Sequence, residues 1–274
     1  MATERVRIEN VSKFFKIRVG RREEQVHALD DVSFSVYDGE IVVLTGLSGC
    51  GKTTLLRIIL GLEKATSGRV VVGDKVVTGC GYDRGMVFQH AELLPWRSAL
   101  GNTEFGLEVK GVPPAERRAI AKKNLELVGL GDSMDRRPDQ LSGGMKQRVG
   151  LARALSIDPE VLLMDEPFGA LDAQTREVLQ AELLDIHERT GKTIVFVTHD
   201  LDEAVLLADR IVLMSPHSGR LKQIFEVDIP RPRRDTIAIR GSEEFHHTRF
   251  EVWRSLMEQE LREQVQTPKA GAAS

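Results

Sequence analysis

Residues 46–53 read Gly46-Leu47-Ser48-Gly49-Cys50-Gly51-Lys52-Thr53, and the chain is best understood outward from this stretch. It lies between an apolar run, Ile41–Thr45, and a segment with helical periodicity, Lys52–Leu62. Glycines let successive backbone N–H groups curl around an anion, and the following helix points its positive end at the same anion. The order of strand, glycine-rich loop and helix therefore predicts a phosphate-binding P-loop.

The side chains of this loop indicate which phosphates it binds. Lys52 can place a positive charge against the β- and γ-phosphates of a nucleotide, and Thr53 can offer its hydroxyl to Mg²⁺. Cys50 lies beside a helix N-terminus, so we expect more thiolate character than in an ordinary buried cysteine, without a catalytic role. The expected nucleotide contacts are Gly46, Leu47, Ser48, Gly49, Cys50, Gly51, Lys52, Thr53 and Thr54.

A second apolar run, Val161–Met164, is followed directly by two carboxylates, Asp165 and Glu166. A carboxylate at the end of a buried strand is costly unless a cation pairs with it. A magnesium ion held beside the P-loop would be that cation, which assigns metal binding to Asp165. Glu166 could then orient or deprotonate the attacking water. An acidic surface turn is the alternative for this pair taken alone.

Composition excludes several classes of protein. Of the 274 residues, 41% are hydrophobic and 29% charged, as in soluble globular chains, and the net charge of −3 gives no argument for nucleic-acid binding. The two cysteines cannot build a disulfide framework, which favours the cytosol. No secretory signal precedes Arg5, and no apolar run is long enough for a membrane span. We expect any work at a membrane to depend on a partner protein.

Short β-branched runs alternate with helical periodicity along the chain. The predicted strands are Arg5–Glu9, Val32–Val36, Ile41–Thr45, Arg69–Val72, Arg84–Phe88, Val161–Met164, Thr193–Thr198 and Arg210–Met214. The predicted helices are Lys52–Leu62, Ala115–Val128, Gly144–Ser156, Gln174–Thr190 and Leu201–Ala208. This order predicts an α/β fold, a P-loop NTPase core with a mostly parallel sheet flanked by helices and an antiparallel β-subdomain before it.

The pattern also suggests how the chain is divided. Residues 1–228 are expected to form the ATPase domain, with an inserted helical subdomain at about 91–155. Residues 229–274 are expected to form a C-terminal extension in which Arg231–Arg234 is a linker and Glu243–Val265 an amphipathic helix. Pro268–Ser274 is small and polar and is expected to fray.

Leu141-Ser142-Gly143-Gly144-Met145-Lys146-Gln147-Arg148 precedes the predicted helix that ends at Ser156. Ser142 is a good N-cap, and a helix start with a hydroxyl and two glycines is also an anion site. With the P-loop and the Asp165-Glu166 pair, this motif resembles the signature of the ABC ATPase family. The resemblance implies that Ser142, Gly143 and Gly144 grip the γ-phosphate of an ATP bound to a second copy of the chain.

Further positions match that family one by one. Gln89 resembles the glutamine that reaches the metal and the attacking water, and His199 resembles the histidine that contacts the γ-phosphate. Asp172, in Gly169-Ala170-Leu171-Asp172, is implied to lie at the interface between copies. Phe15 resembles the aromatic residue that stacks on adenine, with Phe14 as its rival. The resemblance implies the catalytic residues Glu166, His199, Gln89 and Lys52 and the Mg²⁺ ligands Thr53, Gln89 and Asp165.

The neighbourhoods of Gln89 and Asp172 are similar to those of importer ATPases for nitrate, sulfonates and taurine. That branch implies uptake of a small anion through transmembrane permease subunits, served by a solute-binding protein, with this chain on the cytoplasmic face of the cell membrane and no nucleic-acid partner. Two alternatives stay open: the ATPase of an exporter or lipid-transport system, and a non-transport ABC switch protein.

The segment that follows Gln89 suggests where a membrane partner binds. Leu93, Leu94 and Trp96 are apolar residues in a setting typical of a loop. We expect this segment to border a groove that receives a short helix of the permease. The alternative is that Trp96 fills the core of the helical subdomain.

Overall fold

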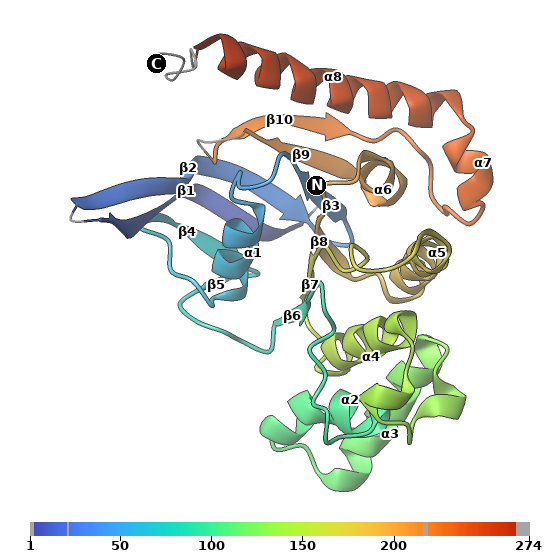
Figure 1. Ribbon diagram of the computed structural model, residues 1–274. Helices are drawn as coiled ribbons and strands as arrows, with labels where there is room; N and C mark the ends of the chain where they lie inside the picture. The colour runs from blue at the N-terminus through green and yellow to red at the C-terminus, as the bar shows by residue number, and fades with distance from the viewer. Residues whose placement is uncertain (1–2, 21, 216–218, 267–274) are drawn as a thin grey trace.

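Two sheets of different kinds organise the computed structural model, which describes residues 3–20, 22–215 and 219–266 (Figure 1). The larger sheet has the strand order β10-β9-β3-β8-β7-β6, with all pairs parallel except β10 with β9. Its strands are β3 (Ile41–Thr45), β6 (Arg84–Val87), β7 (Val161–Asp165), β8 (Thr193–Val197), β9 (Arg210–Met214) and β10 (Leu221–Glu226). Every residue of β3 and β8 is buried, as expected for parallel strands covered on both faces.

The smaller sheet is antiparallel, in the order β2-β1-β4-β5. Its strands are β1 (Glu4–Val19), β2 (Arg22–Tyr37), β4 (Ser67–Val72) and β5 (Lys75–Val76). β1 and β2 are much longer than predicted because their hairpin continues through polar residues such as Lys16, which pairs with Gln25. Both side chains are exposed, so the sequence here lacks the apolar alternation that predicts a strand. Main-chain hydrogen bonds between the two strands extend them through this polar stretch.

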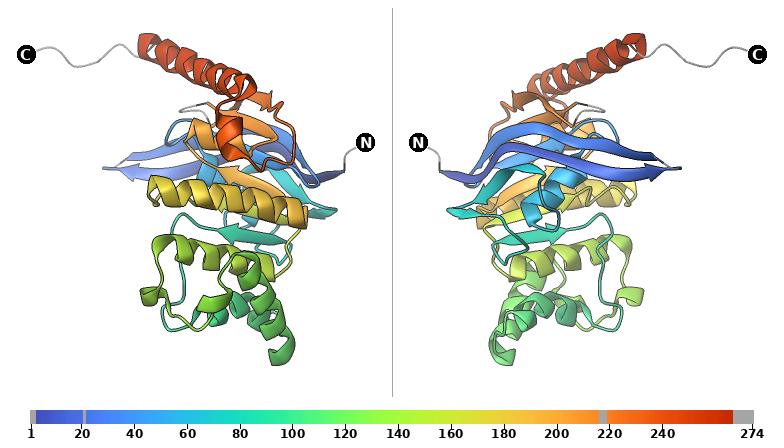
Figure 2. Two further views of the ribbon diagram at one scale, coloured as in Figure 1. Left: turned by 90° about the vertical axis from the view of Figure 1, so that its right-hand side faces the viewer. Right: turned by 90° about the vertical axis from the view of Figure 1, so that its left-hand side faces the viewer.

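Helices cover the larger sheet and form a separate layer beyond β6 (Figure 2). The helices that flank the sheet are α1 (Lys52–Leu60), α5 (Ala173–Thr190) and α6 (Leu201–Leu207). The separate layer, between β6 and β7 in the chain, contains α2 (Ala99–Val109), α3 (Pro114–Leu127), η1 (Gly131–Ser133), η2 (Pro138–Gln140) and α4 (Gly143–Ser156). The predicted α/β core is confirmed.

Helix α2 has no counterpart among the predicted helices. Its sequence contains Gly101, Asn102 and Gly106, residues that lower intrinsic helix propensity. Tertiary contacts compensate, because Asn102 is fully buried and its side chain bonds both the N–H and the C=O of Leu94. Ser98 caps the helix by accepting a hydrogen bond from the Gly101 N–H.

The C-terminal segment contains α7 (Thr236–Arg240) and α8 (Glu243–Gln266), and α8 lies alongside β10 and α6 (Figure 1). The predicted terminal helix is confirmed. The expectation of a linker at Arg231–Arg234 is wrong, because the Arg233 side chain is 1% exposed. Its guanidinium donates to the carbonyls of Ile229, Leu206 and Ala208. Pro268–Ser274 lies outside the described residues.

In the three described ranges, we find no helix that has both the length and the apolar character of a membrane span. The boundary near residue 228 between an ATPase domain and an extension stays a prediction.

Candidate functional site

The P-loop joins β3 to α1. Its backbone packs so closely against neighbouring strands that two of its positions can hold only glycine. Gly46 and Gly51 have φ values of 145° and 94°. A Cβ at Gly46 would lie 2.7 Å from the Met214 carbonyl oxygen, and one at Gly51 would lie 2.3 Å from the Ala28 carbonyl oxygen. The loop is therefore pressed against β9 on one side and β2 on the other. Ser48 and Gly49 are exposed at its mouth, and Thr54 is half-buried in α1.

Lys52 is buried inside this loop. Its Nζ donates to the carbonyl oxygens of Gly46 at 2.8 Å and Leu47 at 3.1 Å. These carbonyl partners hold the ammonium at the N-terminus of α1, where it adds to the positive end of the helix dipole. The loop thus concentrates positive charge where a nucleotide phosphate would bind.

Cys50 is fully buried, with its Sγ 3.6 Å from the Lys52 Nζ. Burial raises the pKa of its thiol, and the attraction of Lys52 only partly opposes this effect. The thiol is therefore less ionised than that of a free cysteine, because loss of hydration outweighs the nearby ammonium, although Lys52 acts in the direction that we expected.

A candidate magnesium site connects α1 to the end of β7. The Thr53 hydroxyl donates to Asp165 Oδ1 at 3.0 Å. Burial raises the pKa of the Asp165 carboxyl above its ordinary value, with Glu166 adding repulsion. A desolvated carboxylate beside a hydroxyl is a donor set that suits a hard cation, so these residues fit Mg²⁺.

Glu166 and His199 face one another across neighbouring strands. The Glu166 Oε2 lies 3.1 Å from the His199 Nδ1. The Glu166 backbone has a φ of 45°, and its N–H donates to the Val197 carbonyl at the end of β8. The two parallel strands end together, so residues 33 positions apart in sequence form one polar pair at the carboxyl edge of the sheet.

Gln89 lies at the same edge, two residues beyond the end of β6. A Cβ placed on Gly169 would be 3.4 Å from the Gln89 Nε2 and 3.6 Å from the Glu166 Oε2. The amide and the carboxylate therefore approach the Gly169 backbone together. The structure thus brings Gln89 into the group formed by Thr53, Asp165, Glu166 and His199.

Phe15 and Phe14 occupy adjacent positions on β1 but differ in their surroundings. Phe14 is half-buried and packs edge-on against His27, with 4.3 Å between ring centroids. Phe15 is 36% exposed. β2 is the strand that pairs with β1, and its Ala28 carbonyl packs closely against Gly51 of the P-loop. The β1–β2 hairpin that carries both rings therefore lies beside the loop. Phe15 is the more accessible of the two rings for stacking on a base.

Apart from the group beside the P-loop, the predicted site residues Ser142, Gly143 and Asp172 form a second group, and all three are exposed. The Ser142 hydroxyl caps α4 by accepting from the Met145 N–H, and Asp172 Oδ1 caps α5 by accepting from the Thr175 N–H. The latter bond lowers the pKa of Asp172. A Cβ on Gly144 would lie 2.7 Å from the Thr175 side chain, so the two helix starts pack together.

Within the described part of the chain, no hydrogen bond or ion pair joins Ser142–Gly144 to the P-loop. The residues predicted to bind nucleotide therefore fall into two separate groups on one molecule.

Three side chains that the sequence analysis did not single out support the Gln89 segment. Gln147 of α4 donates to the Phe88 carbonyl at 2.8 Å. Arg153 donates to the carbonyls of Ala91 and Glu92, and Asn102 holds Leu94. Gln147 belongs to the motif at 141–148, and its place in that motif is the sequence feature that could have identified it as a site residue.

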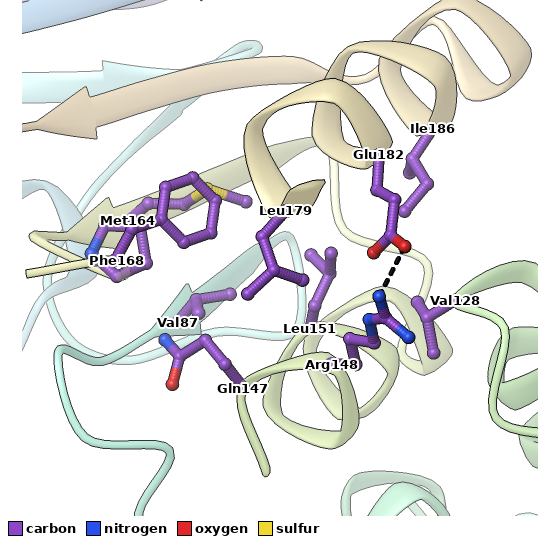
Figure 3. Close-up of a pocket in the computed structure, with 11 residues that line it drawn as sticks. Val87, Val128, Gln147, Arg148, Leu151, Met164, Phe168, Leu179, Glu182 and Ile186 are labelled. Atoms are coloured by element: carbon purple, nitrogen blue, oxygen red, sulfur yellow. Dashed lines mark hydrogen bonds and ion pairs between the residues drawn. The ribbon is translucent and has the colours of Figure 1, made fainter. Parts of the chain in front are cut away.

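A small apolar cavity separates α4 from the sheet and α5 (Figure 3). Figure 3 shows Gln147 and Arg148 at its α4 side and Phe168 and Leu179 opposite. Arg148 pairs with Glu182 of α5 at 2.5 Å on its rim. No residue of the P-loop lines this cavity, so it is distinct from the candidate nucleotide site.

The fold and the site together define a P-loop ATPase of the ATP-binding cassette type. The chain belongs to the ABC transporter family, whose model matches residues 29–169. An uncharacterised ABC transporter ATP-binding protein of Methanocaldococcus jannaschii is 52% identical over 229 residues, with 84% of each chain covered.

Two further relatives have names that state a transport function. The bicarbonate transport ATP-binding protein of Synechocystis is 49% identical over 235 residues, which are 84% of this chain and 82% of that protein. The taurine import ATP-binding protein of Rhizobium johnstonii is 44% identical over 250 residues, which are 90% of this chain and 94% of that protein.

Among solved structures, a dimeric ATP-binding cassette in a post-hydrolysis state with ADP and phosphate bound has a TM-score of 0.71 and 34% identity, and the match covers 82% of this chain and all of the other.

Proposed function

We propose that this chain is the ATP-hydrolysing subunit of an importer for a small anion and works as a head-to-tail dimer. One observation carries the proposal: the Glu166–His199 pair lies at the same sheet edge as the Thr53–Asp165 pair, next to the P-loop. This arrangement brings groups suited to phosphate binding, metal binding and proton abstraction from water to one edge of the sheet.

The P-loop would bind the phosphates, with Lys52 contacting the β- and γ-phosphates and Phe15 stacking on the adenine. Thr53, Asp165 and Gln89 would hold Mg²⁺, which when bound neutralises charge on the β- and γ-phosphates. The raised pKa of Asp165 supports this assignment, because the nearby cations of the protein do not offset its desolvation.

Hydrolysis would follow from the Glu166–His199 pair. Glu166 takes a proton from the attacking water while the water oxygen forms a bond to the γ-phosphorus and the bond to the ADP oxygen breaks. With its Nδ1 facing Glu166, His199 would use Nε2 to contact the γ-phosphate. Lys52 stabilises the charge that develops on the transferred group.

The second exposed group gives the reason for a dimer. Ser142, Gly143 and Asp172 lie at helix starts that favour anions, yet their own chain's P-loop does not meet them. In a head-to-tail pair, each ATP would lie between one P-loop and the partner copy's signature helix. The dimeric solved cassette at 34% identity supports this arrangement.

Relatives support the importer and its class of solute. Relatives at 44–50% identity are named as ATP-binding proteins for taurine import and bicarbonate transport, and both solutes are small and carry an anionic group. We infer a similar solute here, with permease subunits and a solute-binding protein selecting it. The chain would act at the cytoplasmic face of the cell membrane, bound to the permease.

Replacing Glu166 by Gln tests the proposal. The variant keeps the size and one oxygen of the side chain but cannot take a proton. We expect ATP hydrolysis to fall by at least ~10²-fold, the scale of general-base catalysis, and ATP affinity to stay unchanged. Steady-state phosphate release and equilibrium nucleotide binding measure the two effects.

Lys52→Ala is the matched control, since it should weaken MgATP binding itself. A Glu166→Gln protein that hydrolyses ATP at the wild-type rate would overturn the assignment of the base.

A further inference from the structure

The C-terminal segment reaches the His199 region through a line of polar side chains. Arg240, the last residue of α7, donates from Nη2 to the Gln180 Oε1 on α5 at 2.7 Å. Gln180 in turn donates from Nε2 to the Glu203 Oε1 on α6 at 2.9 Å. Gln180 and Glu203 are 2% and 4% exposed, so this line runs through the protein interior.

The line continues to the residue next to His199. The Glu203 backbone N–H donates to the Asp200 Oδ1 at 3.1 Å, and the Asp200 N–H donates to the Thr198 hydroxyl at 3.0 Å, so these bonds tie Glu203 to the residues on both sides of His199. Thr198 is 2% exposed. The donors and acceptors along this line are consistent: Arg240 donates to the Gln180 oxygen, and the Gln180 nitrogen donates to the Glu203 carboxylate.

A second attachment joins α8 to the same segment. Arg249 pairs with Asp202 in the first turn of α6. Asp200 caps that turn by accepting from the N–H groups of Asp202 and Glu203. Phe245 of α8 is 2% exposed and Val252 is fully buried, so the helix is packed rather than loosely attached.

We propose that Arg240, Gln180 and Glu203 are positioning residues that hold His199 against Glu166, so that the C-terminal segment sets the rate of ATP hydrolysis. The inference rests on the roles proposed above for His199 and Glu166. Its physical basis is that a buried carboxylate depends on its few donors. When Arg240 no longer fixes the Gln180 amide, that amide can rotate away from Glu203, and the Thr198–Asp200 turn loses its support.

Arg240→Met tests the proposal, because methionine keeps much of the apolar bulk without any donor. We expect kcat to fall by roughly tenfold, the scale of misplacing one catalytic contact, with KM for ATP unchanged. Arg240→Lys should restore most of the rate, since its ammonium can donate to Gln180. Arg254→Met is the matched control, because Arg254 on α8 pairs with Glu251 of its own helix.

A double-mutant cycle shows whether the effect passes through His199. In a His199→Ala background, Arg240→Met should change kcat by less than about twofold, since the group that it positions is absent. An equal fall in both backgrounds, a raised KM, or an equal loss in Arg254→Met would overturn the proposal.

Hydrogen exchange gives a second readout that does not depend on activity. The Asp200 N–H, bonded to Thr198, should exchange faster in Arg240→Met than in Arg254→Met, and equal rates would overturn the proposal. Glu166→Gln separates this test from the proposed function: if that variant loses hydrolysis while Arg240→Met keeps full activity, only the positioning role fails.

Discussion

At the scale of single residues, the two adjacent carboxylates that end β7 have different surroundings. Asp165 is desolvated and accepts from the Thr53 hydroxyl. Glu166 has left-handed backbone geometry, with a φ of 45°, and faces His199. Such a conformation costs of order 1–3 kcal/mol in a non-glycine residue, and the bond from the Glu166 N–H to Val197 helps to hold it. In the function that we propose, the turn at Glu166 separates the metal ligand Asp165 from Glu166, the base for water.

The raised pKa of Asp165 makes a testable prediction for stability. Its carboxyl favours protonation in the folded state, so its cost to stability begins as pH rises above the ordinary value of 3.8 and is complete only above the raised folded value. Asp165→Asn removes this charge. We expect thermal unfolding at pH 7, without Mg²⁺ or nucleotide, to shift upward by a few degrees.

The same variant should lose the stabilisation that MgATP is expected to give the wild-type chain, because the carboxylate proposed to bind the metal is gone. Differential scanning calorimetry with and without MgATP measures both effects. Asp185→Asn, at an exposed carboxylate with a 64% exposed side chain, is the control and should change neither. A lower midpoint for Asp165→Asn at pH 7 would contradict the desolvation argument.

At the scale of elements, the segment from Gln89 to α2 connects the nucleotide site to the outside of the helical layer. Gln147, Arg153 and Asn102 fix its backbone. Trp96 is 68% exposed, which excludes the alternative that it fills the subdomain core. A rigid backbone with an exposed tryptophan is suited to binding a partner, and we propose the permease as that partner.

Cross-linking tests this contact. Ser98 is a poor site for a cysteine because its hydroxyl caps α2, so Trp96→Cys is preferred, in a Cys80→Ser background that removes the exposed native thiol. In the assembled transporter, we expect a bifunctional thiol reagent to join Trp96→Cys to a permease subunit.

Leu62→Cys is the control, since Leu62 is 58% exposed and lies just after α1. It should give no such product. A complex that still transports but shows no permease cross-link from Trp96→Cys would rule out this surface.

At the scale of the whole molecule, we propose that the P-loop group and the Ser142–Asp172 group are two half-sites carried by one chain. Glu166→Gln should accumulate as an ATP-bound dimer, because ATP still binds but is not cleaved. Adding Ser142→Arg should dissolve that dimer while P-loop binding persists, since a bulky cation would lie where the γ-phosphate of the other copy is expected. Size-exclusion chromatography with MgATP measures the outcome.

Ser142→Ala in the same background is the matched control. It removes the cap of α4, at a cost of about 1 kcal/mol, without adding bulk, so its dimer should weaken far less. If Glu166→Gln binds ATP but never dimerises, alone or with the permease, the shared-site mechanism is wrong.

Local sequence determined the nucleotide-binding half of the protein. The P-loop, the strand that ends at Asp165 and the cap at Ser142 are each contained in a few consecutive residues. Their chemistry depends on backbone geometry that those residues specify directly: glycines at positive φ, a buried apolar strand and a hydroxyl at a helix start. The α/β fold and the terminal helix could be predicted for the same reason, because hydrophobic periodicity is also local.

Tertiary structure alone decided what depends on neighbours distant in sequence. The raised pKa of Cys50 follows from its burial, and Arg233, in an apparent linker, is anchored by carbonyls more than 20 residues away. The line from Arg240 through Gln180, Glu203 and Asp200 to Thr198 joins three helices and a strand end. Desolvation and long-range hydrogen bonds have no periodicity along a chain, so only the folded arrangement shows them.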